Sequence, residues 1–230
     1  MIRFLSFLVE KGFAAQGFNY EKQHVKNLQD KGLMSRTAKA AGSSADAPDA
    51  TIQIKGNTHS LEIKKDRNAF MGQAELHHND EKGWHVSPNT EKKYPGTTKY
   101  LAKTGFLKKI NKQWGKPSGD YDTDRKMGNV YHTEPGVEGI ATHYGHDRET
   151  PYMQIGGHGL MHVGKDEAKL GTTKLSGNTQ LRARMKYRGT DKKTGKKKYG
   201  ALIVMNLKNP PKSKIDLDNP EHVSALTAKK

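Results

Sequence analysis

The feature that most constrains this fold is a pair of short apolar runs, DATIQI and HSLEIKK, joined by KGNT. Alternating apolar residues on either side of a glycine-containing turn predict a β-hairpin. If the turn is centred between Gly56 and Asn57, cross-strand neighbours follow directly, and Asp49 comes to lie opposite Lys64. The sequence therefore predicts a hairpin with a carboxylate at its open end.

The predicted hairpin also gathers charge on one of its faces. Glu62 and Lys64 are two residues apart and share a face, whereas Leu61 and Ile63 point into the core. Asp49, Glu62 and Lys64 should then converge on a small patch. Two carboxylates suit Mg²⁺ (or Mn²⁺), an oxygen-liganded cation that can activate water against a phosphodiester. The alternative is a surface hairpin whose charges form weak, solvated ion pairs.

The motif formed by these residues resembles a known nuclease core. Pro48-Asp49, a gap of 12 residues and then Glu62-Ile63-Lys64 is similar to the PD-(D/E)XK superfamily, which includes restriction enzymes, phage exonucleases and Holliday-junction resolvases. The likeness covers roughly residues 17–80. It implies an α/β fold of the restriction-endonuclease-like type, a mixed β-sheet flanked by helices. It also implies a catalytic role for Lys64 beside the two acids.

Three further segments extend the resemblance. GFNYEKQHVKNLQDKGL is similar to the family's first helix, in which an inward-facing acid, here Glu21, joins the catalytic and metal-binding residues. GSSADAPD resembles the serine-bearing loop of junction resolvases and implies DNA contacts from Ser43 and Ser44. AFMGQAEL occupies the place of a helix that carries a polar residue near the scissile phosphate, here Gln73.

Charge points to the same class of partner. The net charge of +16 and the pI of about 9.8 favour nucleic acid, and the absence of cysteine excludes disulfides and thiolate chemistry. Four cations alternate along LRARMKYRG, and such a row is most easily explained by a phosphate backbone lying across it. We expect these residues to bind DNA: Arg182, Arg184, Lys186 and Arg188.

The chain's organisation is less sharply indicated. Residues 1–32 are expected to be helical, with Asn19 as an N-cap and Gly32 as the stop. We expect a nuclease core over residues 1–120 and a basic, β-rich elaboration over residues 121–230, although the second half can equally be an insertion into the first domain's sheet. No apolar run reaches the length of about 20 residues that spans a bilayer, so no membrane partner is expected and the predicted location is cytoplasmic, with a phage-encoded origin left open.

The histidines and glycines suggest three other kinds of site. The HGLMH segment has the spacing of two zinc ligands, but its glycines argue against a helix and it lacks the glutamate of zinc proteases. A histidine–metal nuclease of the ββα type is a further alternative, suggested by HHND. GGHG lacks the lysine and serine of a phosphate-binding P-loop.

The sequence thus predicts a Mg²⁺-dependent deoxyribonuclease. As the resemblance implies, hydrolysis would leave a 3′-hydroxyl and a 5′-phosphate, and the favoured reaction is endonucleolytic cutting of branched or duplex DNA, with a homodimer left open. A phage-type exonuclease and a sequence-specific restriction or homing enzyme are alternatives within the nucleases. The competing class is a non-catalytic basic protein that binds nucleic acid.

Overall fold

The computed structural model describes the backbone of residues 2–37 and 47–228, and the side chains within those ranges from residue 15 onward. Ser43 and Ser44 lie outside the described residues. The chain is mixed α/β and forms two units, one made of residues 1–69, 148–175 and 210–230 and the other of residues 70–147 and 176–209. The expected boundary near residue 120 falls inside the second unit. The two units therefore alternate along the chain, which no local composition shift announces.

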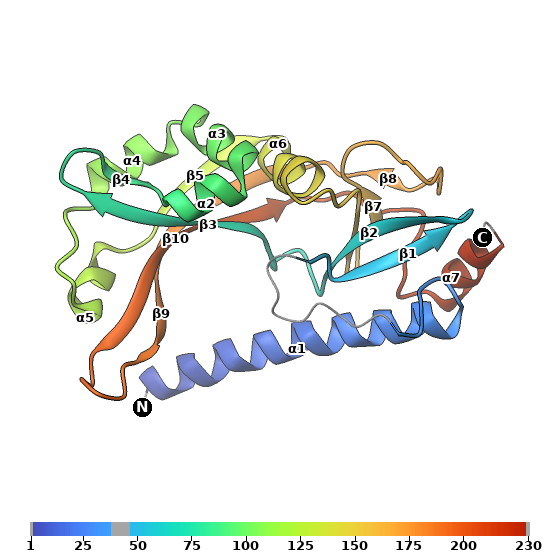
Figure 1. The fold of residues 1–230 in the computed structure, drawn as a ribbon, viewed down its shortest axis with the longest axis horizontal. Coiled ribbons are helices and arrows are strands. Elements are labelled where there is room, and N and C mark those ends of the chain that lie inside the picture. The colour runs from blue at the N-terminus through green and yellow to red at the C-terminus, as the bar shows by residue number, and fades with distance from the viewer. Residues whose placement is uncertain (1, 38–46, 229–230) are drawn as a thin grey trace. The chain divides into compact units, whose positions relative to one another are not determined.

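The first unit contains a five-stranded mixed sheet. Its strands, in spatial order, are β1 (Ala50–Ile54), β2 (Asn57–Lys64), β6 (Tyr152–Ile155), β7 (Gly159–His162) and β8 (Thr173–Lys174). The pairs β1–β2 and β6–β7 are antiparallel, and the pairs β2–β6 and β7–β8 are parallel. This unit also contains two helices, α1 (Ile2–Asp30) and α7 (Pro220–Thr227) (Figure 1).

Helix α1 is continuous from Ile2 to Asp30, so the expected N-cap at Asn19 is wrong and this residue lies inside the helix. The expected stop at Gly32 is confirmed. Gly32 has φ of 66°, and the amide of Leu33 donates to the carbonyl of Leu28 at 2.8 Å, which is the Schellman arrangement of a helix end. Leu28 and Leu33 are both buried, so this turn fixes the end of α1 on the core.

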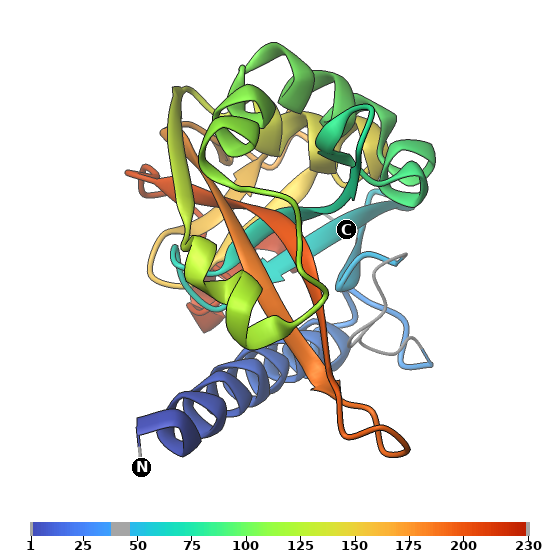
Figure 2. The ribbon, with the colours of Figure 1, turned by 90° about the vertical axis from the view of Figure 1, so that its left-hand side faces the viewer.

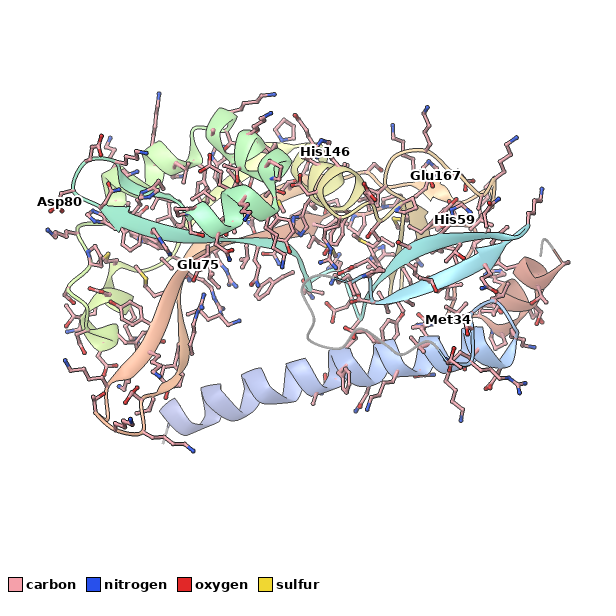
Figure 3. All side chains as sticks on the ribbon, in the orientation of Figure 1. Met34, His59, Glu75, Asp80, His146 and Glu167 are labelled. Atoms are coloured by element: carbon pink, nitrogen blue, oxygen red, sulfur yellow. The ribbon has the colours of Figure 1, made fainter. Side chains whose placement is uncertain are left out.

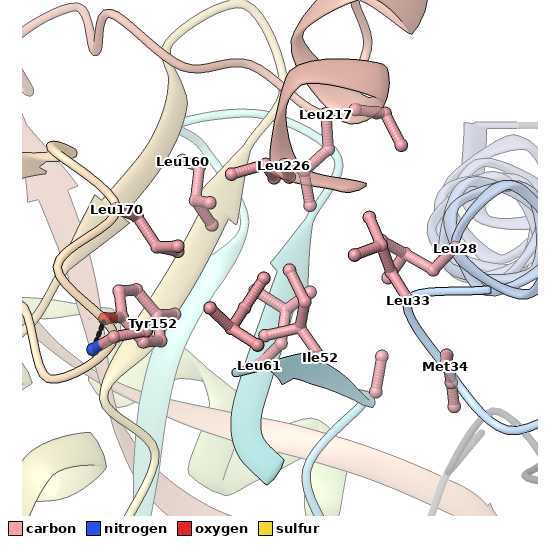
Figure 4. Close-up of a cluster of buried hydrophobic side chains, with 14 of the residues drawn as sticks. Leu28, Leu33, Met34, Ile52, Leu61, Tyr152, Leu160, Leu170, Leu217 and Leu226 are labelled. Carbon is pink, nitrogen blue, oxygen red and sulfur yellow. Dashed lines mark hydrogen bonds between the residues drawn. The ribbon is translucent and has the colours of Figure 1, made fainter. Parts of the chain in front are cut away.

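The core of the first unit lies between its sheet and its two helices (Figure 4). Apolar residues from β1 and β2 meet side chains from the end of α1 and from the C-terminal segment, and each is at most 1% exposed. This cluster includes Leu28, Leu33, Ile52, Leu61, Leu217 and Leu226. Leu61 and Ile63 both belong to this cluster, which confirms that they are core-facing residues of β2.

The second unit contains a five-stranded antiparallel sheet. Its strands, in spatial order, are β4 (Gly83–Val86), β3 (Phe70–Asn79), β10 (Lys197–Lys208), β9 (Asn178–Thr190) and β5 (Val130–Pro135). The helices are α2 (Pro88–Lys93), α3 (Pro95–Lys103), α4 (Phe106–Gln113), α5 (Tyr121–Asp124) and α6 (Glu138–Ala141), with a 3₁₀ turn at Arg125–Met127 and a π-helical turn at Thr142–Asp147. Figure 1 shows α2, α3 and α4 on one side of the sheet, and Figure 2 shows the long β9–β10 hairpin.

The helix expected around Gln73 is wrong, because residues 70–79 form strand β3. Gln73 pairs with Val204 of β10, far along the chain. Tertiary pairing here overrides a segment whose local preference was weak. Ala74 and Leu76 are buried between exposed or half-buried neighbours, the alternation of a strand with one face in a core, and Met71 is buried beyond an irregularity in the pairing.

None of the helices in the described part of the chain is long and apolar enough to cross a membrane.

Candidate active site

The predicted hairpin is confirmed as β1 and β2, but its register differs from the expected one. Ala50 pairs with Leu61 and Ile54 with Asn57, so the turn residues are Lys55 and Gly56, with φ of 51° and 76°. Two consecutive positive φ values are typical of the type I′ turns that close tight hairpins. The pairing is shifted by two residues relative to expectation.

This shift changes the partner of Asp49 without changing its face. Asp49 precedes β1 directly, and continuing the observed register places it opposite Glu62, not opposite Lys64 as expected. Side chains alternate with a period of two, so a two-residue shift keeps the same set of residues on each face. The predicted convergence of Asp49, Glu62 and Lys64 therefore survives the correction.

Lys64 lies between the two carboxylates. Its Nζ is 2.5 Å from Oε1 of Glu62 and 4.0 Å from Oδ2 of Asp49. Glu62 is 2% exposed and Asp49 is 7% exposed, which is rare for carboxylates unless they are paired. The solvated-hairpin reading requires exposed charges, so this burial disagrees with it.

The backbone fixes the position of Asp49. The amide of Ile63 donates a hydrogen bond to Oδ2 of Asp49 at 2.8 Å. Strand β2 thus carries Glu62 and Lys64 on one face while its backbone holds the carboxylate that precedes β1. Glu62 and Lys64 are placed by strand β2, and Asp49 is held by the backbone of the same strand, which favours a preorganised site.

A second cation, Arg148, completes the group. Its Nη2 donates to the carbonyl of Ala47 at 2.8 Å and lies 3.5 Å from Oε2 of Glu62. Sequence reasoning missed this residue, because a single arginine in the segment HDRET carries no motif and lies far from the hairpin in sequence. Only the parallel pairing of β2 with β6, which begins shortly after Arg148, brings it there.

Glu21 lies close enough to Asp49, Glu62 and Lys64 for their charges to shift its pKa. Burial and the charges of Asp49 and Glu62 raise the pKa of Glu21 to about 7, against an opposing effect of Lys64. Glu21 lies one turn before His24 and Val25 on the same face of α1, the buried face that also carries Leu28. Its Oε2 is buried and has no hydrogen-bond partner among the described residues.

The acids of the group are crowded electrostatically. Burial and the charge of Glu62 raise the pKa of Asp49 to about 6, although Lys64, the Ile63 amide and Arg148 act in the opposite direction. Buried carboxylates that repel one another bind a cation readily, because the cation removes the repulsion. Perturbed pKa values of this kind cluster at functional sites.

The donor set fits a hard divalent cation. Within residues 15–37 and 47–228, no three His, Cys, Asp or Glu side chains are already arranged around one point to hold a metal ion. Mg²⁺, however, takes one or two protein carboxylates and keeps several waters. Asp49 and Glu62 supply such a pair, and the unsatisfied Oε2 of Glu21 is a further oxygen donor.

The remaining predicted site residues lie elsewhere. Gln73 is exposed on β3 in the second unit, so its role beside the acids stays a prediction. Strand β9 contains the basic row: Arg182, Arg184 and Lys186 are half-buried and alternate, through Leu181 and Ala183, with core residues.

Arg188 departs from the simple row. The pairing of β9 with β10 shifts between Lys198 and Tyr199, which leaves Arg188 as the extra residue of a bulge. Its guanidinium bonds Oε1 of Glu75 at 2.5 Å. The expectation that all four cations alternate regularly therefore holds only for the first three.

The histidine segment has no helical metal site. His158 belongs to the β6–β7 hairpin and His162 ends β7, so the i, i+4 spacing does not place the two side chains one above the other. The glycines of GGHG lie in and beside the turn of this hairpin.

No protein-family model matches this chain, and neither a curated protein nor a solved structure matches it significantly.

Proposed function

We propose that this protein is a Mg²⁺-dependent deoxyribonuclease whose active site contains Asp49, Glu62, Lys64 and Glu21. The observation that carries the proposal is the buried contact of Lys64 Nζ with Glu62 Oε1, with Asp49 Oδ2 at 4.0 Å. Two buried carboxylates and a lysine at the end of a hairpin are the arrangement that the PD-(D/E)XK resemblance implies. A purely structural ion pair with Lys64 explains the burial of one acid, but it does not explain why three acids lie close together.

The residues have separable roles under this proposal. Asp49 and Glu62 would hold Mg²⁺ (or Mn²⁺), with Glu21 as the third acid. When bound, the ion would polarise the phosphodiester and lower the pKa of a bound water. Lys64 would orient the attacking water and offset negative charge as the phosphate is attacked.

Arg148 would act through Glu62. It sets the orientation of this carboxylate from the side opposite to Lys64, because Lys64 contacts Oε1 and Arg148 lies nearest to Oε2. We therefore assign Arg148 as a positioning residue.

DNA binding is proposed for the second unit. The half-buried cations Arg182, Arg184 and Lys186 share one face of the sheet, and +16 of net charge favours a polyanion. This observation also favours the second candidate, a basic protein that binds nucleic acid without cutting it. The substrate within the DNA class is proposed as branched or duplex DNA cut internally, with an exonuclease as the alternative.

The deciding experiment is a cleavage assay with and without Mg²⁺. Supercoiled plasmid, linear duplex and a four-way junction would be tested in parallel, with Lys64→Ala as the control for contaminating nucleases. We expect metal-dependent cutting that disappears in Lys64→Ala. Binding without cutting on every substrate, unaffected by Asp49→Ala and Glu62→Ala, would establish the non-catalytic alternative.

A further inference from the structure

The face of the second unit's sheet that carries the β9 cations also carries Glu75, which is labelled in Figure 3. The register places Arg182 beside Val204 and Tyr131, Arg184 beside Leu202, and Glu75 beside Leu202. Directly paired residues point to the same side of a sheet. These side chains therefore share one face, and the residues that alternate with them, such as Ala74, Ala183 and Ile203, form the core on the other.

Two exposed aromatic rings lie on this same face. Among the described side chains, the exposed large hydrophobic residues are Phe18, Phe70 and Tyr131, and the last two are 40% and 45% exposed. Tyr131 pairs with Arg182, and the Arg182 and Arg184 guanidinium carbons lie 5.4 and 5.7 Å from the centre of the Phe70 ring. Phe70 is thus flanked by two guanidinium groups and still exposes much of its ring.

Covering the sheet explains only part of this arrangement. Leu202 and Val204 on this face are only 4% and 1% exposed, and the arginines paired with them have long stems that cover such apolar residues. Shielding does not require Tyr131 to be exposed, nor does it require a Phe at the edge of the covered area. Exposed rings interleaved with cations instead offer flat apolar platforms next to phosphate-binding groups.

The charge of the face is compatible with nucleic acid despite its acid. Glu75 is bonded by Arg188 and is thereby neutralised. Arg182, Arg184 and Lys186 then remain as the cations of the row. The Nε of Arg182 is buried and has no hydrogen-bond partner among the described residues, so the structure leaves at least one donor of this row unsatisfied.

We propose that this sheet face binds single-stranded DNA, with bases stacked on Phe70 and Tyr131 and the backbone held by the cations of β9. A duplex keeps its bases stacked inside and presents phosphates, which exposed rings do not contact. A single strand presents both bases and phosphates, and stacking on aromatic residues beside a basic groove is how proteins bind it. Resting on the proposed function, this inference names the substrate as DNA with a single-stranded arm or gap.

Binding is tested on the full chain carrying Asp49→Asn, in EDTA, so that no cleavage is needed. Fluorescence anisotropy would compare a labelled single strand of about 16 nucleotides, the upper site size of single-strand binders, with a duplex of equal length. The test variant is Phe70→Leu with Tyr131→Leu, which keeps apolar side chains and removes the rings. Phe18→Leu is the matched control, because Phe18 is 38% exposed and has Lys22 Nζ 4.2 Å from its ring centre.

We expect the single strand to bind more tightly than the duplex, and the double variant to weaken single-strand binding by about tenfold or more. Duplex binding should change by less than about twofold, since phosphate contacts dominate there, and this also shows that the variant is folded. Phe18→Leu should change neither. Phe70→Trp keeps an aromatic ring at this position, so it should bind the single strand as tightly as the chain that carries Asp49→Asn alone.

Equal affinity for both DNAs, or unchanged single-strand binding in the double variant, would overturn the inference. The nuclease proposal is judged separately, by whether the wild-type chain with Mg²⁺ cuts DNA. Cutting of plain duplex without ring-dependent single-strand binding would refute this inference alone, whereas ring-dependent binding without any cutting would refute the nuclease proposal alone.

Discussion

The two units use charged residues in opposite ways. In the first unit, Asp49 and Glu62 are almost fully buried, and the pKa of Asp49 rises because burial and the neighbouring acid oppose its charge. In the second unit, the cations Arg182, Arg184 and Lys186 of β9 are only half-buried on one face of the sheet. Buried like charges destabilise a fold, so the first arrangement demands a functional explanation more strongly than the second.

The largest effect is expected at Lys64. Lys64→Ala removes the cation between the two acids, and cleavage should fall by about 10²–10⁴-fold, the usual effect of losing a group that handles the attacking water. Lys65→Ala is the matched control, because it removes the same charge from the next residue, which contacts Gln16 instead of the acids. Rates would be measured by single-turnover cleavage; equal losses in both variants would contradict the proposed site.

Loss of Arg148 should lower stability. Arg148→Met leaves the buried Glu62 without one of its cationic neighbours, and the free energy of unfolding should fall by about 2–4 kcal/mol. Urea denaturation in EDTA measures this change. Arg67→Met, at an exposed position, is the comparison and should change stability by less than about 0.5 kcal/mol. If Arg148→Met also changed the free energy of unfolding by less than about 0.5 kcal/mol, the stability of buried Glu62 would not depend on Arg148.

The pH dependence of the free energy of unfolding should also reveal the repulsion between the buried acids. The pKa of Asp49 is raised from 3.8 to about 6, so the folded protein binds this proton more tightly than the unfolded chain, and stability falls as pH rises through that range. Without metal, Asp49→Asn should therefore be more stable than wild type at pH 8, on the order of 1–2 kcal/mol, and equal to it at about pH 4.

The matched comparison is Asp166→Asn in the same unit. Burial opposes the charge of Asp166, but hydrogen bonds from Tyr152, Leu170 and Gly171 outweigh burial and lower its pKa. This substitution should therefore destabilise the protein at pH 8. Effects of the same sign in both variants would refute the pKa difference between the two sites.

The smallest effect is expected in the second unit. Arg184→Gln should weaken DNA binding by roughly three- to tenfold and reduce the salt dependence of binding by about one phosphate contact. Lys193→Gln, in the exposed turn of the β9–β10 hairpin, is the control with the same loss of charge. Binding isotherms at several salt concentrations separate the two. If both substitutions act alike, the face has no special role and only net charge matters.

Local pattern was enough to predict the hairpin but not its register. The alternation of apolar residues and the segment KGNT indicate two strands and a turn. A turn at Lys55 and Gly56 and a turn one residue later are, however, equally compatible with the sequence. The observed choice places Gly56 at φ of 76°, where glycine has no steric penalty. The convergence of the acids was predictable because it depends on which face a residue occupies, and both registers agree on that.

What the sequence could not predict depends on distant pairing. Residues 70–79 become a strand because β10 pairs with them, and Arg148 reaches Glu62 because β6 lies beside β2. The alternation of the two units along the chain has the same origin. Exposed rings such as Phe70 and Tyr131 also carry no signal in sequence, since an aromatic residue in a strand is usually buried.

The interleaved path has a consequence for the order in which the molecule is made. Leu217, Val223 and Leu226 belong to the cluster that lies beneath β1 and β2, and the amide of Leu160 in β7 bonds the carbonyl of Ile215. These residues are synthesised after every strand of both sheets. The layer beneath β1 and β2 is therefore incomplete on the ribosome until residue 226 has emerged, after every strand of the second unit has been made.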